Sequence, residues 1–162
     1  MAFLNQSQRD IAGVLTNGIH VVKASATIPQ TTTQHLFTVA GGRCLVLLLF
    51  GEVTTVIQGT DPVLKITSTP TVGTAVDVAS TVDTSSLEVG GLLTVEGDGT
   101  ALVKGNAGAG LFGSQVGRWI VPIGFIDLIS GASKTGATKW DVFYVPLDDG
   151  AVFYTAAAEH IR

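Results

Sequence analysis

A glycine-rich segment is the part of the chain whose spacing comes nearest to a cofactor site. Its core, GAGLFG at residues 108–113, has the glycine pattern of loops that bind dinucleotides. In such loops a following helix presents backbone amides to the pyrophosphate. Here the chain continues as SQVGRWIVPIG, and its glycines, proline and β-branched residues disfavour a helix. We therefore interpret residues 105–113 as a surface loop and expect no nucleotide cofactor.

Residue types that bind metals or act as nucleophiles are present but scattered. The histidines, His20, His35 and His160, lack the spacing of metal ligands. Cys44 is the only cysteine, so it cannot form an internal disulfide. It lies in an apolar run, and an apolar setting raises the pKa of a thiol. No serine occupies a G-x-S-x-G motif. We expect neither catalytic residues nor a metal site, and so not an enzyme.

All charged residues in the stretch between Lys65 and Lys104 are acidic. A cleft that cleaves glycosidic bonds with paired carboxylates also uses aromatic residues to hold the sugar. The stretch has no aromatic residue. The GDG sequence at residues 97–99 lacks the further acids of a calcium loop. We interpret the stretch as a solvated acidic edge that discourages aggregation between sheets. A sharper hypothesis is that it docks on a basic partner surface; its contact residues would be Asp77, Glu88 and Glu96.

The composition limits the class of protein. The chain has 162 residues, of which 46% are hydrophobic and 14% charged, against about 25% charged in typical domains. Its net charge is −4 and its basic residues are dispersed, which argues against a nucleic-acid partner. Its apolar runs are too short for a membrane-spanning helix of about 20 residues, and no signal-peptide pattern follows Met1. We expect one domain that hides apolar surface by self-association.

The elements that position these residues are predicted to be strands. The run from Arg43 to Gln58 opens with CLVLLLF and predicts a strand that is buried on both faces. Two-residue alternation predicts half-buried strands around residues 64–67, 76–78, 93–96 and 140–144. Turn residues predict hairpins over residues 92–104 and 144–155, and Pro146 predicts an edge strand or a bulge. Trp119 and Trp140 are expected to anchor the core or a subunit interface.

Short strands without a long helical pattern predict an all-β fold. We expect an antiparallel β-sandwich or jelly-roll-like barrel over residues 19–162, preceded by an N-terminal arm over residues 1–18. In the arm, apolar residues at helical spacing are stopped by Asn17-Gly18. A helix of about two turns is marginal alone, so the arm is expected to order against a partner, with a frayed terminus as the alternative. The apolar residues available for that contact are Phe3, Leu4, Ile11, Val14 and Leu15.

The succession of several short segments resembles small proteins encoded near the head genes of tailed bacteriophages. The segments are TTVIQ (54–58), LKI (64–66), PTVG (70–73), VDV (76–78), GFIDL (124–128), GATKW (136–140) and YVPLDDGA (144–151). Their order, rather than any one motif, carries the likeness, which covers residues 36–157. The resemblance implies a virion component, namely a capsid decoration (cement) protein with a β-sandwich or jelly-roll-like body.

Decoration proteins commonly sit as trimers where shell subunits meet. The resemblance therefore implies a homotrimer on the outer surface of the capsid that bridges major capsid protein subunits and stabilises the expanded shell. Such a protein needs no cofactor, metal, nucleic acid or membrane. Two alternatives stay open. One is a tail or baseplate component, and the other is a carbohydrate-binding adsorption module, which predicts exposed aromatic residues in a groove.

Overall fold

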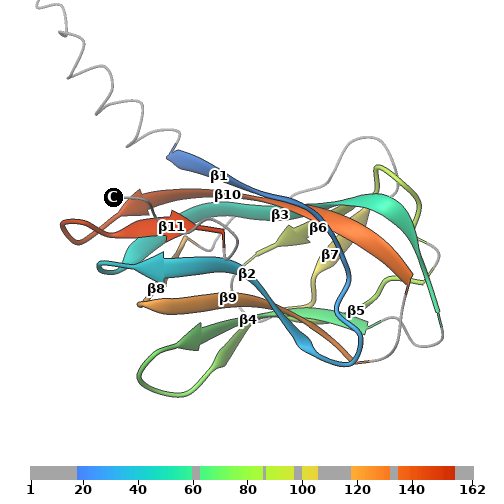
Figure 1. The fold of residues 1–162 in the computed structure, drawn as a ribbon, viewed down its shortest axis with the longest axis horizontal. Coiled ribbons are helices and arrows are strands. Elements are labelled where there is room, and N and C mark those ends of the chain that lie inside the picture. Colours follow the sequence, from blue (N-terminus) through green and yellow to red (C-terminus); the bar gives the residue numbers. More distant parts are fainter. Residues whose placement is uncertain are drawn as a thin grey trace, which may run out of the picture.

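The computed structural model describes residues 18–59, 63–85, 87–96, 100–105, 118–131 and 135–155, and this part of the chain is all-β (Figure 1). The strands are β1 (Ile19–Thr27), β2 (Thr33–Ala40), β3 (Cys44–Gln58), β4 (Val63–Pro70), β5 (Val76–Asp83), β6 (Leu92–Val95), β7 (Val103–Gly105), β8 (Trp119–Val121), β9 (Gly124–Ser130), β10 (Thr135–Pro146) and β11 (Val152–Tyr154). Their residues are rich in valine, leucine, isoleucine and threonine, which pack well on pleated surfaces.

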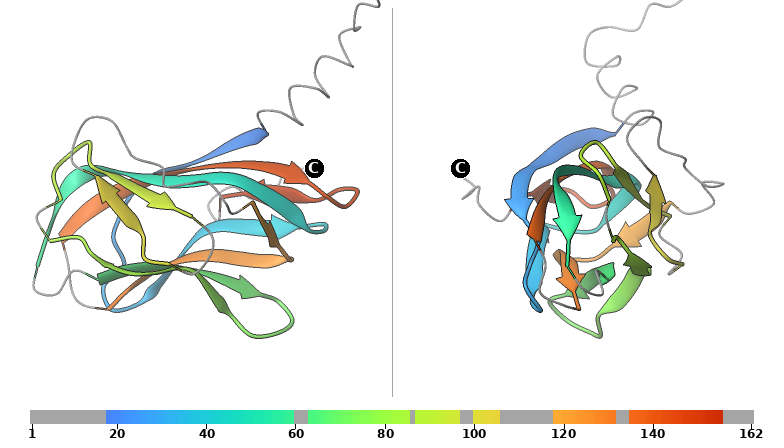
Figure 2. Two further views of the ribbon diagram at one scale, coloured as in Figure 1. Left: turned by 180° about the vertical axis from the view of Figure 1, so that it is seen from behind. Right: turned by 90° about the vertical axis from the view of Figure 1, so that its right-hand side faces the viewer.

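The strands form two antiparallel sheets that pack as a sandwich around one core (Figure 2). Sheet A has the order β1-β10-β3-β6-β7, with β8 paired to the start of β3, and sheet B has the order β11-β2-β9-β4-β5. The pairs β1–β10, β2–β9, β3–β6 and β4–β5 are nested within one another along the chain. The predicted all-β antiparallel sandwich is confirmed.

The long apolar strand β3 lies inside sheet A, between β10 on one side and β8 and β6 on the other. Its inward residues are buried beneath sheet B. The described residues leave its other face half-exposed, so the predicted burial of that face, by copies of the chain, stays a prediction. The side chains that alternate with the buried ones remain half-exposed. Those buried are Cys44, Val46, Leu49, Val53 and Ile57, and those half-exposed include Leu45, Leu47, Leu48 and Phe50.

Of the two predicted hairpins, one is confirmed and one is wrong. Strands β6 and β7 pair antiparallel, as residues 92–104 predict. The segment over residues 144–155 is not a hairpin, because β10 pairs with β1 and β3 whereas β11 pairs with β2 in the other sheet. Pro146 is the last residue of β10, and β1 pairs only as far as Tyr144. The missing amide of Pro146 therefore costs no bond to β1.

Four turns gather at one end of the sandwich, on the left in Figure 1. They join β2 to β3, β4 to β5, β8 to β9 and β10 to β11. The first residue of β1, Ile19, is at this end as well, since it pairs with Tyr144 near the end of β10. We call this region the turn end. It comprises the turns at residues 41–43, 71–75, 122–123 and 147–151 together with the strand residues that border them.

Candidate interaction surface

Exposed apolar side chains collect at the turn end. Val72, at the tip of the β4–β5 turn, is 90% exposed, Val76 is 62% exposed and Ile120 of β8 is 58% exposed. Ile123 and Leu147, in the neighbouring turns, are exposed as well. Of the large hydrophobic side chains that are exposed in the described part of the chain, only Val22 and Val89 lie elsewhere. A cluster of this kind is typical of a protein–protein contact.

Two shallow hollows lie within this apolar cluster and share Pro122. One, of about 280 Å³, lies between β8 and the β4–β5 hairpin and is lined by Val76, Val78, Trp119 and Ile120 among others. The other, of about 240 Å³, lies among the turns and is lined by Val72, Ile123, Arg43 and Asp148 among others. Both are smaller than the roughly 300–1,000 Å³ of typical small-molecule sites. Their size and lining favour apolar side chains of a partner over a metabolite.

An ion pair joins two of the turns beside the second hollow. Asp148 accepts hydrogen bonds from the backbone amide of Arg43 at 2.7 Å and from its guanidinium at 2.9 and 2.8 Å. These side-chain and backbone hydrogen bonds from Arg43 hold the pKa of Asp148 well below its usual range. The turns also touch through backbone, because a Cβ on Gly41 would lie 2.0 Å from the carbonyl oxygen of Gly150. Residues far apart in sequence thus fix the shape of the turn end.

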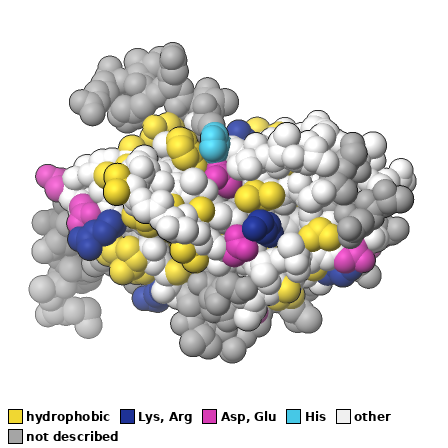
Figure 3. Space-filling view, turned by 90° about the horizontal axis from the view of Figure 1, so that it is seen from below, with side chains coloured by type: hydrophobic (Ala, Val, Ile, Leu, Met, Phe, Trp, Pro, Cys, Tyr) yellow, Lys and Arg dark blue, Asp and Glu magenta, His cyan; other side chains and the backbone are white. Residues whose placement is uncertain are grey.

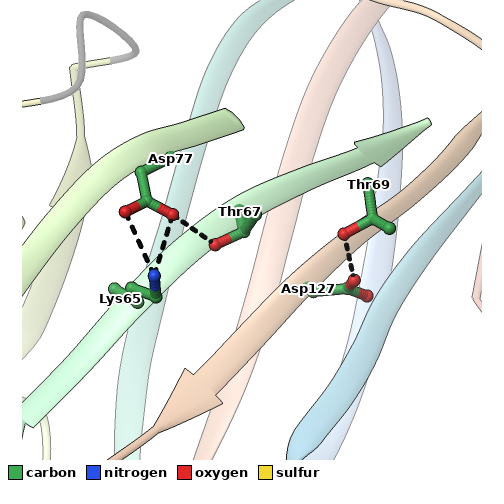
Figure 4. Close-up of polar contacts among 5 residues, drawn as sticks. All are labelled: Lys65, Thr67, Thr69, Asp77 and Asp127. Atoms are coloured by element: carbon green, nitrogen blue, oxygen red, sulfur yellow. Dashed lines mark hydrogen bonds and ion pairs between the residues drawn. The ribbon is translucent and has the colours of Figure 1, made fainter. Parts of the chain in front are cut away.

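The outer face of sheet B carries a first polar group, which involves one of the predicted contact residues. Asp77 of β5 accepts hydrogen bonds from Lys65 Nζ at 3.0 and 3.1 Å and from Thr67 Oγ1 at 2.8 Å (Figure 4). The bond from Thr67, followed by that from Lys65, lowers the pKa of the Asp77 carboxyl. Although no base lies near Asp77 in sequence, strand pairing supplies one. Asp77 is therefore not a free acid on the surface.

A second polar group lies beside the first on the same face. Thr69 Oγ1 donates to Asp127 Oδ2 at 2.6 Å (Figure 4), and His35 Nδ1 donates to Asp127 Oδ1 at 2.5 Å. The Asp127 side chain is only 3% exposed, while His35 is 47% exposed and stacks on Phe125. In a catalytic triad the histidine lies between the hydroxyl and the carboxylate. Here the carboxylate lies between the other two, so the group ties β2, β9 and β4 together and activates no nucleophile.

Sheet A carries a matching group on its outer face. His20 Nε2 donates to Asp141 Oδ1 at 2.7 Å and stacks on Phe143. Neither pairing was predicted from the sequence, because His20 and Asp141 are 121 positions apart and His35 and Asp127 are 92 apart. A partial signal exists in the segments FID and DVF, which place a phenylalanine and an aspartate on one face of a strand. Nothing in the sequence indicates the histidine partners.

The predicted contact residues come from separate elements. Asp77 lies in β5, Glu88 in the segment between β5 and β6, and Glu96 directly after β6. Trp119 of β8 is half-buried, packs on the core and lines the larger hollow, whereas Trp140 is fully buried. The arm lies outside the described residues, as does His160. The predicted arm contacts, which all fall in that part of the chain, are Phe3, Leu4, Ile11, Val14 and Leu15.

The face of the molecule that contains β4 and β9 is of mixed charge (Figure 3). Figure 3, which views the face containing β4 and β9, shows acidic and basic side chains next to one another among uncharged ones. The described residues include no group of three or more His, Cys, Asp or Glu side chains that could hold a metal ion. Over the same ranges, no helix is long and apolar enough to cross a membrane.

Comparison with known proteins gives no relative for this chain. No protein-family model matches the sequence, and comparisons with curated proteins and with solved structures find no significant match.

Proposed function

We propose that this protein is a structural component of a tailed-phage virion that decorates the outer surface of the capsid and bridges major capsid protein subunits. The observation that carries the proposal is the nested order of strand pairs β1–β10, β2–β9, β3–β6 and β4–β5 over two sheets. A long antiparallel hairpin rolled into two sheets has this order, and such jelly rolls recur in viral capsid domains. The resemblance to phage head proteins points to the same class.

Jelly rolls also occur in lectins, so the carbohydrate-binding alternative must be weighed. A sugar platform needs exposed aromatic rings in a groove. Trp140 is fully buried, and Trp119 is half-buried against the core with valine, isoleucine and proline around it. The described part of the chain thus offers no pair of exposed tryptophans. This favours a protein–protein role over glycan binding.

A cement protein needs apolar contacts for assembly and further contacts for the shell. The turn end and the half-exposed outer side chains of β3 are suited to the first role in a homotrimer. Glu88 is exposed and Glu96 half-exposed, so both acids lie at the surface where a basic shell contact would form. Asp77, the third predicted contact, forms an ion pair with Lys65 in the same sheet.

The test is to locate the protein on particles of the phage that encodes it. Purified protein is added to DNA-filled heads lacking tails and, separately, to isolated tails, and bound protein is imaged by electron cryomicroscopy. We expect regular density on the outer head surface where shell subunits meet. Binding to tails alone would support the tail or baseplate alternative. Binding to neither particle, together with measurable affinity on a glycan array, would support the adsorption module.

A charge-reversed variant tests the shell contact on the same heads. Glu88→Lys combined with Glu96→Lys is expected to lower head occupancy and to weaken its dependence on salt, because exposed charge pairs are screened by ions. Thr55→Lys combined with Gln58→Lys is the control, since it adds two positive charges at exposed positions outside both the acidic stretch and the turn end. Equal occupancy for both variants would remove the acidic residues from the proposed contact.

A further inference from the structure

We propose that the apolar turn end is covered by residues 3–15 of the N-terminal arm of a second copy of this chain. The inference does not depend on the capsid role, because it rests on the exposed side chains and on where the arm begins. It assigns an occupant to the two hollows beside Pro122 and a function to the arm.

The apolar side chains of the turn end are exposed to solvent, which favours a partner that covers them. Val72, Val76 and Ile120 are all more than half exposed. Strand pairing positions the backbone of Val76 and Ile120. Beside Val72, the amide of Thr71 donates to the Ile123 carbonyl oxygen at 2.9 Å, so hydrogen-bonded backbone presents these side chains outward. Each hollow is open and has mainly apolar lining. An amphipathic segment that inserts a few side chains into such hollows is a recurrent mode of recognition.

The arm begins at the rim of this same end. A Cβ on Gly18 would lie 2.9 Å from Leu47 Cδ1 and 3.1 Å from the Tyr144 amide nitrogen, so residue 18 is held against sheet A. Gly18 has a φ of +75°, in the left-handed region that commonly ends a helix. The 17 residues before it therefore leave the body where the apolar cluster starts. Within them, Ile11, Val14 and Leu15 have the i, i+3, i+4 spacing of helix-in-groove anchors.

The register of sheet A indicates that the arm serves a neighbour rather than its own body. Ile19 pairs with Tyr144, Tyr144 with Val46, and Val46 with Trp119, so these residues form one row across four strands. Three strand spacings place Trp119 about 14 Å from the start of β1. Even a fully extended chain spans only about 10 Å from Gly18 to Leu15 and about 14 Å from Gly18 to Val14. Ile11, Val14 and Leu15 therefore cannot together reach the larger hollow of their own body, which lies beyond Trp119.

When copies exchange their arms, the distance from Gly18 to the hollow of the same body no longer limits the contact. When turn ends of several copies meet around a symmetry axis, each arm begins close to the hollows of the next copy. Every copy then gives one arm and receives one, and the contacts close into a ring without leaving an arm unbound. The tethered arm is also present at high effective concentration once the bodies associate.

The test combines oligomeric state with matched surface variants, measured by size-exclusion chromatography with light scattering. The full chain is expected to be oligomeric, and deletion of residues 1–16 is expected to give a folded monomer. Val72→Asp and Ile120→Asp, made on the receiving side, are each expected to dissociate the oligomer. Val89→Asp is the control, because Val89 is 54% exposed but lies away from the turn end. A monomeric full chain, or an oligomer that survives either the deletion or Ile120→Asp, would overturn the proposal.

A cross-linking experiment identifies the occupant directly. Ile11→p-benzoylphenylalanine is made in unlabelled protein and mixed with ¹⁵N-labelled full chain, and cross-linked peptides are identified by mass spectrometry after illumination. We expect links from unlabelled residue 11 to labelled peptides that contain Val72 or Ile120. Links confined to unlabelled peptides would show that the arm covers its own body, and links to other surfaces would show that it binds elsewhere. Either result rejects exchange at the turn end.

Discussion

Gly51 of β3 lies directly opposite Trp140 of β10, and the indole ring occupies the space that a side chain at position 51 would take. A Cβ on Gly51 would lie 2.8 Å from the indole atoms Cε2 and Cζ2. The ring is fully buried, and its Nε1 donates to Thr138 Oγ1 at 3.0 Å. The glycine that interrupts the apolar run therefore makes room for the largest side chain in the core.

Gly51→Ala is expected to destabilise the fold. The added methyl cannot be accommodated without moving a buried ring whose hydrogen bond fixes its position, and overpacking of this kind costs about 1–3 kcal/mol. The free energy of unfolding is measured by urea denaturation, followed by circular dichroism. Gly131→Ala is the control, because a Cβ there meets nothing within 4 Å. Equal stability of the two variants would mean that the indole ring is free to shift.

Local sequence patterns predicted the strands, because the alternation of buried and exposed side chains in a strand depends on neighbouring residues only. The two-residue alternation at Trp140, Val142 and Tyr144 places all three in the core, as expected. The hairpin of β6 and β7 likewise follows from short-range turn chemistry. One face of β3 is buried by the second sheet, as expected. An apolar run cannot tell whether a sheet or a partner covers the other face, so burial of that face stays a prediction.

Which strands pair with one another over long sequence distances could not be predicted, for a physical reason. Gly150 has the positive φ expected of a turn glycine, of +78°, yet the turn leads to the other sheet. The alternation of β11 fits pairing with β10 as well as with β2, and only the whole core decides between them. The same holds for the candidate surface. Val72, Ile120 and Ile123 become neighbours through the arrangement of the turns, which no local spacing encodes.

Thr69→Val is expected to lower stability by about 1–3 kcal/mol, because it removes a hydrogen-bond donor from the buried Asp127 carboxylate. The shape of the side chain is nearly unchanged, so the loss reports the hydrogen bond. Thr33→Val on β2 serves as the control at an exposed position of the same sheet. Chemical denaturation of both variants gives the comparison. If Thr69→Val is as stable as Thr33→Val, water replaces the lost donor and the carboxylate is less enclosed than the structure indicates.

The Cys44 thiol is expected to resist alkylation in the folded protein. Burial, with a smaller contribution from Asp148, raises the pKa of Cys44 to about 11, and the side chain is fully buried. Because the thiolate is the reactive form, labelling by iodoacetamide at pH 8 should proceed only through unfolding. The labelling rate should then rise with urea in parallel with the unfolded fraction. Rapid labelling without denaturant would show that the start of β3 opens locally.

The Arg43–Asp148 pair is expected to make stability depend on acid. Since the folded chain lowers the pKa of Asp148, the unfolded chain binds a proton more readily, and acid favours unfolding. This contribution is complete above the unfolded carboxyl pKa of about 4 and is lost as the pH falls toward the folded value. Asp148→Asn should therefore lower the melting temperature at pH 7, and its difference from the native protein should shrink below pH 4.

Asp149→Asn is the matched control for that experiment, because it removes the same charge from the same turn but leaves the hydrogen bonds of Arg43 to Asp148 in place. Melting temperatures of the three proteins are measured by calorimetry between pH 2.5 and 7. If the contact of Asp148 with Arg43 stabilises the turn end, the deficit of Asp148→Asn at pH 7 exceeds that of Asp149→Asn. Because both partners are partly exposed, high salt should reduce that excess as well. A deficit that is the same for both variants, or that persists unchanged at pH 2.5, would assign the effect to net charge or to the turn backbone instead of the ion pair.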